Sequence, residues 1–160
     1  MIVVADSSPL HYLILLEQAE ILRRLYGNVL VPDAVAAELR APAAPRRVSE
    51  WMSRPPSWLR IIEVSATDLL SVADELDLGE RAAIAVAERT GADLLLIDES
   101  AGRAEARRRS LRVTGTLGVL RAAATAGLID VRQVVTRLQE TNFYVDETLL
   151  RTVFEKWLQE

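Results

Sequence analysis

The chain has 160 residues, of which half are hydrophobic and 26% are charged, a composition typical of one soluble globular domain with a full core. It contains no cysteine, which excludes disulfides, thiolate metal sites and cysteine nucleophiles, and it has no apolar run of the ~20 residues that a membrane-spanning helix needs. The net charge of −4 does not by itself indicate a nucleic-acid-binding protein.

The first predicted element is a buried strand over residues 1–5. Because this strand begins without a basic leader, we expect no signal peptide, a cytoplasmic location and no association with membranes. Ser8 is expected to cap a helix whose first residue is Pro9. Four further strands are predicted from apolar runs, over residues 29–31, 59–64, 94–97 and 111–113.

Helices are predicted between and after these strands from apolar residues at helical spacing. They span residues 9–16, 17–26, 33–40, 67–76, 79–90, 100–110, 117–126, 131–141 and 146–159. The segment from Ala41 to Trp58 contains four prolines and is predicted to be a loop with one helical turn around residues 49–53. Strands that alternate with helices predict a three-layer α/β domain with a mostly parallel sheet.

The apolar run over residues 94–97 ends at Asp98 and Glu99, and predicts a strand that is buried on both faces of a parallel sheet. The residues that follow such a strand emerge at the carboxyl edge of the sheet, where open α/β folds bind ligands. Since Asp6 follows the first strand in the same way, we expect Asp6 and Asp98 to lie at one edge. An aspartate in either position is also a common cap of the next helix.

Two glutamates are candidates to join this edge. Glu38 has small apolar neighbours one turn earlier, and the sequence leaves open whether it points inward or lies solvated beside an arginine. Glu80 heads the apolar stripe of its helix, because apolar residues recur three, four and seven positions later, and this indicates a core-facing side chain. The alternative for Glu80 is compensation of the helix dipole, which is favourable by about a few tenths of a kcal/mol.

Four carboxylates at one edge would repel one another, by roughly 4 kcal/mol for a pair about 4 Å apart at an effective dielectric of about 20. No lysine or histidine is close to them in the sequence, and oxygen-only ligation is what Mg²⁺ and Mn²⁺ prefer. We therefore predict a divalent metal site suited to phosphodiester hydrolysis. The single histidine, His11, lies on an apolar helix, which favours a packed residue over a catalytic base.

A phospho-receiver domain also gathers carboxylates at strand ends. Such a domain needs a lysine beside the acidic pocket, and the only lysine of this chain, Lys156, lies in the last predicted helix. The sequence therefore argues against this signalling function.

Five motifs occur in order along residues 1 to about 130. They are Asp6-Ser7-Ser8-Pro9-Leu10, VPDAV followed by EL at 31–39, LGERAAIA at 78–85, LID at 96–98 and VTGTLGVL at 113–120. Together they resemble the PIN-domain family, most closely the prokaryotic subgroup related to the VapC toxins of type II toxin–antitoxin systems. The resemblance implies a single PIN-like domain over residues 1–160, with helices over 131–160 that lie beyond the motifs.

The resemblance implies a metal-dependent endoribonuclease that uses Mg²⁺ or Mn²⁺. Carried over by position, the catalytic and metal-binding residues are Asp6, Glu38, Glu80 and Asp98. Many relatives have aspartate where this chain has Glu80, whose longer side chain still permits ligation. The alternative within the family is a catalytically idle fold that acts as a binding or regulatory module.

Hydroxyl side chains are expected to support this site. Some relatives have a further acidic residue where this chain has Thr114-Gly115-Thr116. We expect Thr116 to cap the following helix, and the hydroxyl of Thr114 or Thr116 to hold a metal-bound water. Ser7 is expected to orient Asp6 or a ligand water.

The resemblance also implies an RNA substrate, and it places Arg103 and Arg107, which share a helical face, near the RNA path. For Arg108 and Arg109 we prefer a solvated face with ion pairs to Glu105. Trp51 and Trp58 are the only aromatic residues that we consider as surface platforms for RNA bases, and either is equally compatible with burial. The expected protein partners are a cognate antitoxin and a second copy of the chain in a homodimer.

Overall fold

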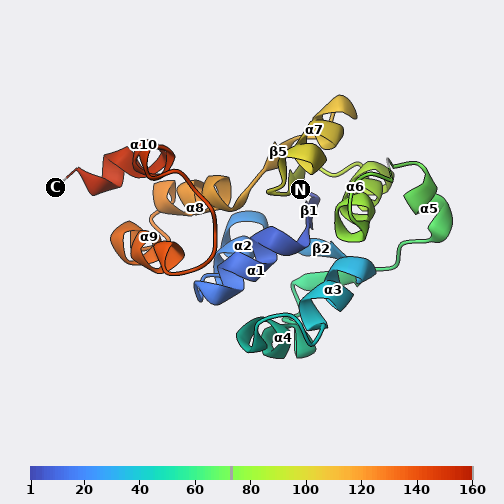
Figure 1. Cartoon of the computed structure of the whole chain (residues 1–160), viewed down its shortest axis with the longest axis horizontal. Helices are drawn as coiled ribbons and strands as arrows, with labels where there is room; N and C mark the ends of the chain where they lie inside the picture. The colour runs from blue at the N-terminus through green and yellow to red at the C-terminus, as the bar shows by residue number, and fades with distance from the viewer. Residues whose placement is uncertain (73, 160) are drawn as a thin grey trace.

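The computed structural model describes residues 1–72 and 74–159, and its five strands form one sheet between layers of helices (Figure 1). The strands are β1 (Val3–Ala5), β2 (Val29–Pro32), β3 (Leu59–Ile62), β4 (Leu94–Leu96) and β5 (Val113–Thr114). Their order is β3-β2-β1-β4-β5, and each neighbouring pair is parallel. The predicted α/β class with a mainly parallel sheet is confirmed, and the described sheet is parallel throughout.

Ten helices are found within the described residues. The first five are α1 (Ser7–Leu15), α2 (Glu20–Tyr26), α3 (Asp33–Arg40), α4 (Arg46–Ser53) and α5 (Ala66–Leu70). The others are α6 (Leu78–Thr90), α7 (Ser100–Arg108), α8 (Thr116–Thr125), α9 (Val131–Gln139) and α10 (Glu147–Leu158). None of the described helices combines the length and the apolar character that crossing a membrane requires.

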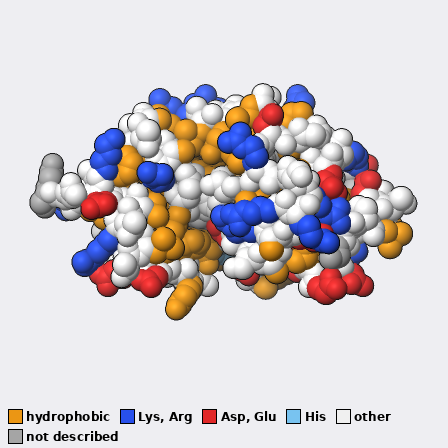
Figure 2. Space-filling model, turned by 90° about the horizontal axis from the view of Figure 1, so that it is seen from above, with side chains coloured by type: hydrophobic (Ala, Val, Ile, Leu, Met, Phe, Trp, Pro, Cys, Tyr) orange, Lys and Arg blue, Asp and Glu red, His pale blue; other side chains and the backbone are white. Residues whose placement is uncertain are grey.

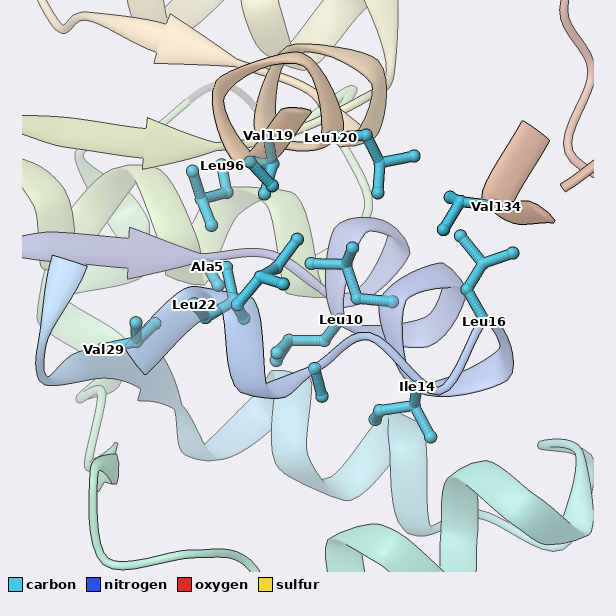
Figure 3. Close-up of a cluster of buried hydrophobic side chains, with 14 of the residues drawn as sticks. Ala5, Leu10, Ile14, Leu16, Leu22, Val29, Leu96, Val119, Leu120 and Val134 are labelled. Carbon is cyan, nitrogen blue, oxygen red and sulfur yellow. The ribbon is translucent and has the colours of Figure 1, made fainter. Parts of the chain in front are cut away.

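Alternation of side chains along the central strands divides the core into two parts. Val3 and Ala5 of β1 pack in the larger cluster, which includes residues of α1, α2, α8 and the C-terminal helices, while Val4 packs in the smaller cluster with α6. Figure 3 shows Ala5 and Leu96 directed toward Leu10 of α1 and Val119 of α8. Since both faces of the sheet are covered, the carboxyl ends of β1 and β4 remain as the place where polar residues can gather.

Helix α4 corrects the prediction of a loop with one turn. Pro45 lies directly before the helix, and its carbonyl oxygen accepts hydrogen bonds from the backbone N–H groups of Val48 and Ser49. Val48 and Met52, one helical turn apart, are buried in the larger cluster. The prolines thus flank the helix, where a missing N–H costs nothing, and do not interrupt it.

Several helix boundaries also differ from the prediction; α2, for example, begins at Glu20 and not at Glu17, whose φ of 59° is not helical. Asp6, and not Ser8, is the N-cap residue of α1, although its carboxylate makes no capping hydrogen bond. Pro9 is the third residue of α1, where its missing N–H is again without cost. Helix α5 ends at Leu70 and not at Leu76, and position 73 of the predicted helix lies outside the described residues. Its capping box is formed by Ser65 and Asp68, and none of its five residues is buried, so packing does not extend it.

Candidate active site

The carboxyl edge of the sheet brings residues from four elements together. Asp6 follows β1 and Asp98 follows β4, and these strands are neighbours, with the backbone N–H of Asp6 donating to the carbonyl oxygen of Leu96 at 2.9 Å. Glu38 lies in the last turn of α3 and Glu80 in the first turn of α6. The parallel topology thus places all four candidates toward the carboxyl end of the sheet.

Asp6 is buried, with 3% of its surface exposed, and its Oδ1 atom has no hydrogen-bond partner. Burial raises the pKa of this carboxyl to about 7; a backbone hydrogen bond from Ser7 opposes the shift, and the nearby carboxylates of Asp77, Glu80 and Glu38 add to it. Ionisation of this carboxyl is therefore costly in the fold, and a bound cation would offset the cost.

Glu80 is 6% exposed, which confirms the prediction that it faces the core. It also forms a capping box, because its Oε1 accepts from the backbone N–H of Asp77 at 3.3 Å while the Asp77 carboxylate accepts from the N–H of Glu80 at 2.9 Å. Oε2 of Glu80 is buried without a hydrogen-bond partner. Burial, followed by the charge of Asp77, raises the pKa of Glu80. The helix-terminal role and the inward orientation therefore coexist in one side chain.

Gly79 allows Glu38 to reach this region from the solvent side. A Cβ atom at Gly79 would lie 3.0 Å from Oε2 of Glu38 and 3.3 Å from Oδ1 of Asp6, so the two carboxylates approach the same point from two elements. Gly102 of α7 has the same relation to Glu80, since a Cβ there would lie 2.9 Å from Oε2. Glycine at both positions leaves space for the carboxylates that a side chain would fill.

Asp98 has a different environment, because hydrogen bonds satisfy its carboxylate. Oδ2 accepts from the hydroxyl of Ser8 at 2.8 Å and from the hydroxyl of Thr116 at 2.7 Å, and Oδ1 accepts from the backbone N–H of Thr116 at 2.7 Å. Gly115 is the N-cap residue of α8, so the prediction that Thr116 caps this helix is wrong. The fully buried Thr116 hydroxyl instead orients Asp98.

The donor set fits a hard divalent cation. Two buried carboxylate oxygens, on Asp6 and Glu80, lack partners, and every candidate ligand atom is an oxygen, as Mg²⁺ and Mn²⁺ prefer. Within residues 1–72 and 74–159, however, no three acidic or histidine side chains already converge closely enough to enclose one ion. The residues that could hold a cation are thus assembled at one edge without forming a closed cage.

A family model described as a PIN domain matches residues 2–159. The chain belongs to the PIN-domain family. The match extends past the last motif, which ends at residue 120, to include α9 and α10. PIN domains are generally nucleases, and they usually use divalent metal ions. No curated protein matches the chain.

The hydroxyl side chains around the site of this PIN domain differ in part from the prediction. Ser8, which the sequence indicated only as a cap, binds Asp98, whereas Ser7 contributes its backbone N–H to Asp6. Thr114 ends β5, and its hydroxyl lies directly beside Gly118 in a groove that Asp98 also lines.

Asp77 is a residue of this region that the sequence reasoning missed. Its carboxylate caps α6 at Glu80 and lies close enough to raise the pKa of both Asp6 and Glu80. The spacing of the capping box, an aspartate three positions before Glu80, is the signal that could have found it.

The arginines of α7 fall into two groups. Arg103 is half-buried and donates from Nη1 to the carbonyl oxygen of Ile97 at 3.2 Å, beside Asp98, and Arg107 is exposed. Arg108 and Arg109 form ion pairs with Glu105, as expected, and Arg109 also contacts Glu88 at 2.6 Å. Of these four arginines, the first two are therefore the better candidates for a phosphate contact.

The aromatic residues decide one alternative that the sequence left open and confirm one expectation. Trp58 is buried and its ring centroid is 6.1 Å from that of the half-buried Trp51, so this pair belongs to the core and not to an RNA surface. His11 is half-buried against Tyr12, and burial lowers its pKa, as expected of a packed residue. A strongly exposed aromatic side chain is Tyr144, at 97%, which the sequence did not single out.

Proposed function

We propose that this PIN domain is a metal-dependent endoribonuclease that hydrolyses RNA phosphodiester bonds with Mg²⁺ or Mn²⁺. The observation that supports the proposal most directly is the pair of buried, unpartnered oxygens on Asp6 and Glu80 at the carboxyl edge of the sheet. Burial without a partner is costly for a carboxylate, and a divalent cation would offset that cost. Glu38 and Asp98 complete an all-oxygen donor set.

A divalent cation bound here would supply Lewis-acid chemistry and activate water. The chain's own groups have distinct tasks in this proposal. Asp98 is held in one orientation by Ser8 and Thr116, so it can ligate without reorganisation. Asp6 has a buried Oδ1 without a hydrogen-bond partner, so it is suited to hold the cation directly. One of the four carboxylates would take the proton from the attacking water. Glu38 is exposed, so its side chain can turn toward the cation without disturbing the core.

Asparagine variants test this proposal. Asp6→Asn and Asp98→Asn are expected to lower RNA cleavage in Mn²⁺ by at least about 100-fold while the far-ultraviolet circular dichroism stays that of the folded chain. Glu63→Gln, on the exposed connection after β3, is the matched control and should cleave normally. Normal cleavage by either asparagine variant would overturn the assignment.

The catalytically idle fold is a second candidate, and one observation favours it: no three candidate ligands enclose an ion in the described part of the chain. Calorimetric titration with Mn²⁺ separates the two. The nuclease proposal expects binding that Asp6→Asn and Glu80→Gln weaken, whereas an idle fold binds no Mn²⁺ and cleaves no RNA.

We further propose that the protein is the toxin of a toxin–antitoxin pair, related to the VapC subgroup, and that it forms a homodimer. The motifs that resemble this subgroup support the proposal. Expression of the chain alone should arrest growth, and expression with the product of a small neighbouring reading frame should relieve the arrest. Growth that is unaffected by the chain would contradict the toxin proposal.

A further inference from the structure

A groove of about 580 Å³ runs from Asp98 toward the C-terminal segment, within the roughly 300–1,000 Å³ range of ligand sites. One wall carries Asp98 and Arg103, and the other carries Tyr144 and Leu149. Figure 2 shows, on the face seen from above, patches of hydrophobic side chains with both basic and acidic side chains beside them. The groove thus contains the Asp98 carboxylate of the candidate site, the positive charge of Arg103 and an apolar wall.

The guanidinium group of Arg103 is held in place in this groove. Arg103 uses one of its five N–H donors on the carbonyl oxygen of Ile97. A Cβ atom at Gly115 would lie 2.9 Å from Nη1 of Arg103 and 2.5 Å from Oδ1 of Asp98, so glycine is what allows the two groups to come together. The remaining donors of a half-buried guanidinium are suited to a phosphate oxygen next to Asp98.

The aromatic ring on the opposite wall is exposed on an anchored segment. The hydroxyl of Tyr12 donates to Oδ1 of Asn142 at 2.8 Å, and the ring of Tyr12 meets that of Phe143 edge to face at 4.8 Å. The next residue, Tyr144, is 97% exposed. An aromatic ring on a fixed backbone loses little conformational entropy when a base stacks on it.

Asp146 is a second carboxylate that lines the groove. Its Oδ1 accepts from the backbone N–H of Thr148 at 2.7 Å and so caps α10. The charge of Asp146 is directed toward the start of its own helix, where it is stabilised, and Arg103 remains the charged group that can meet an anion.

We infer that this groove binds a nucleotide of single-stranded RNA, with a phosphate on Arg103 and a base on Tyr144. The inference rests on the proposed function, because Asp98 at the end of the groove is then the residue that this nucleotide approaches. Arg103 offers donors for a phosphate oxygen, and the exposed ring of Tyr144 offers a face on which a base can stack. Charge and stacking both favour RNA.

Binding of a labelled RNA oligonucleotide in EDTA, where metal-dependent cleavage is absent, tests the inference. Tyr144→Ala is expected to weaken binding by about 10-fold, and Tyr144→Phe to restore it to within about 2-fold, because stacking needs the ring and not the hydroxyl. Leu70→Ala on α5, which removes another strongly exposed apolar side chain, is the matched control and should bind as the unchanged protein does. Arg103→Ala should reduce the slope of log affinity against log salt by about 0.7, as one phosphate contact predicts.

A spectroscopic variant separates stacking from an indirect effect. Tyr144→Trp is expected to add fluorescence that RNA quenches, beyond the change seen for the three native tryptophans. Absence of any added quenching, together with unchanged affinity of Tyr144→Ala, would overturn the inference.

The outcomes distinguish this inference from the proposed function. Cleavage and RNA affinity that do not respond to Tyr144→Ala, while Asp98→Asn is inactive, would overturn the groove and leave the nuclease. RNA binding that depends on Tyr144 without cleavage in Mn²⁺ would support the groove and overturn the nuclease. A change of oligomeric state in Tyr144→Ala at constant RNA affinity would mean that the groove is a protein interface, and the inference would be wrong.

Discussion

Asp6 and Asp98 follow neighbouring parallel strands and look alike in the sequence, yet the fold gives them opposite environments. Asp98 accepts three hydrogen bonds, from Ser8 and Thr116. Asp6 is buried with an unpartnered oxygen among other carboxylates, and its pKa is raised to about 7. The protein's own hydrogen bonds stabilise the charge of Asp98, whereas no group of the protein stabilises a negative charge on Oδ1 of Asp6.

For the proposed nuclease, this difference would let one edge of the sheet combine a ligand that is already oriented with a ligand that needs a cation. Hydrogen bonds to Asp98 fix a ligand in advance, which reduces the reorganisation needed on binding. The unpartnered oxygens of Asp6 and Glu80 raise the free energy of the cation-free state, and a bound cation would lower it. Substitutions at the two aspartates should therefore change stability with opposite signs.

The largest effect is expected at Asp6, at high pH in EDTA. The fold raises the pKa of Asp6 from 3.8 to about 7, so the folded state binds this proton more tightly than the unfolded state. The free energy of unfolding should fall as pH rises from about 4 to about 7, by about 4 kcal/mol in total, because the unfolded chain releases the proton first.

The Asp6→Asn variant tests this, because its amide cannot ionise and so keeps that stability. Its free energy of unfolding should exceed that of the wild type by up to about 4 kcal/mol at pH 8, with little difference at pH 4. Urea denaturation between pH 4 and pH 8 measures both, with the exposed Asp74→Asn as control. A wild-type protein whose stability is constant over this range would refute the description of Asp6.

Asp98→Asn should lower stability, by about 1–3 kcal/mol at pH 7. An amide has one acceptor oxygen, and its NH₂ group would face a donor where Oδ1 or Oδ2 now accepts. Urea denaturation of Asp98→Asn at pH 7 gives the sign of this change in the free energy of unfolding. Equal signs for Asp6→Asn and Asp98→Asn at pH 8 would remove the contrast between the two sides of the site.

Thr116→Val removes one hydrogen bond to Asp98 from a fully buried position while the side-chain volume stays similar. We expect the free energy of unfolding to fall by about 1.5 kcal/mol, because the acceptor of the lost hydrogen bond is charged. If the hydroxyl orients Asp98, Thr116→Val should also weaken Mn²⁺ binding in calorimetry. Thr116→Ser keeps the hydroxyl and should recover most of that affinity. A valine variant with normal Mn²⁺ affinity would show that this hydroxyl does not orient Asp98.

The smallest effect is expected for Ser8→Ala, which leaves the two bonds from Thr116 in place. We expect the free energy of unfolding to fall by about 0.5–1 kcal/mol, because the donor that is removed is neutral and half-buried. Ser7→Ala is the matched control one position earlier, because the group that Ser7 directs at Asp6 is its backbone N–H. If Ser7→Ala costs as much stability as Ser8→Ala, the assignment of the two serines is wrong.

Much of the fold was predictable because burial on both faces leaves a strong apolar signal in β1, β2 and β4. The helix α4 was not, since a segment with four prolines favours a loop, although Pro45 only precedes the helix. Local composition does not reveal on which side of a proline a helix starts. The burial of Val48 and Met52, which decides it, depends on packing against distant segments.

For the candidate site, the identity of the acidic residues came from motifs, but their environments did not. That Oε1 of Glu80 is used in a capping box while Oε2 is unpartnered follows from the packing of α7 over α6 at Gly102. The exposure of Tyr144 follows from the anchoring of its neighbours on Tyr12, which is more than 100 positions earlier. Contacts at such separations leave no periodic trace in the sequence.

The strand order has a consequence for synthesis on the ribosome. β1, β2 and β3 are adjacent in the sheet and contiguous in the chain, whereas β4 and β5 add to the other side of β1. Asp98 joins the edge only with β4, and its hydrogen bonds need Thr116 at the start of α8. A nascent chain therefore contains three of the five described strands before its acidic edge is complete, and the bonds that hold Asp98 can form only after about three quarters of the chain has been translated.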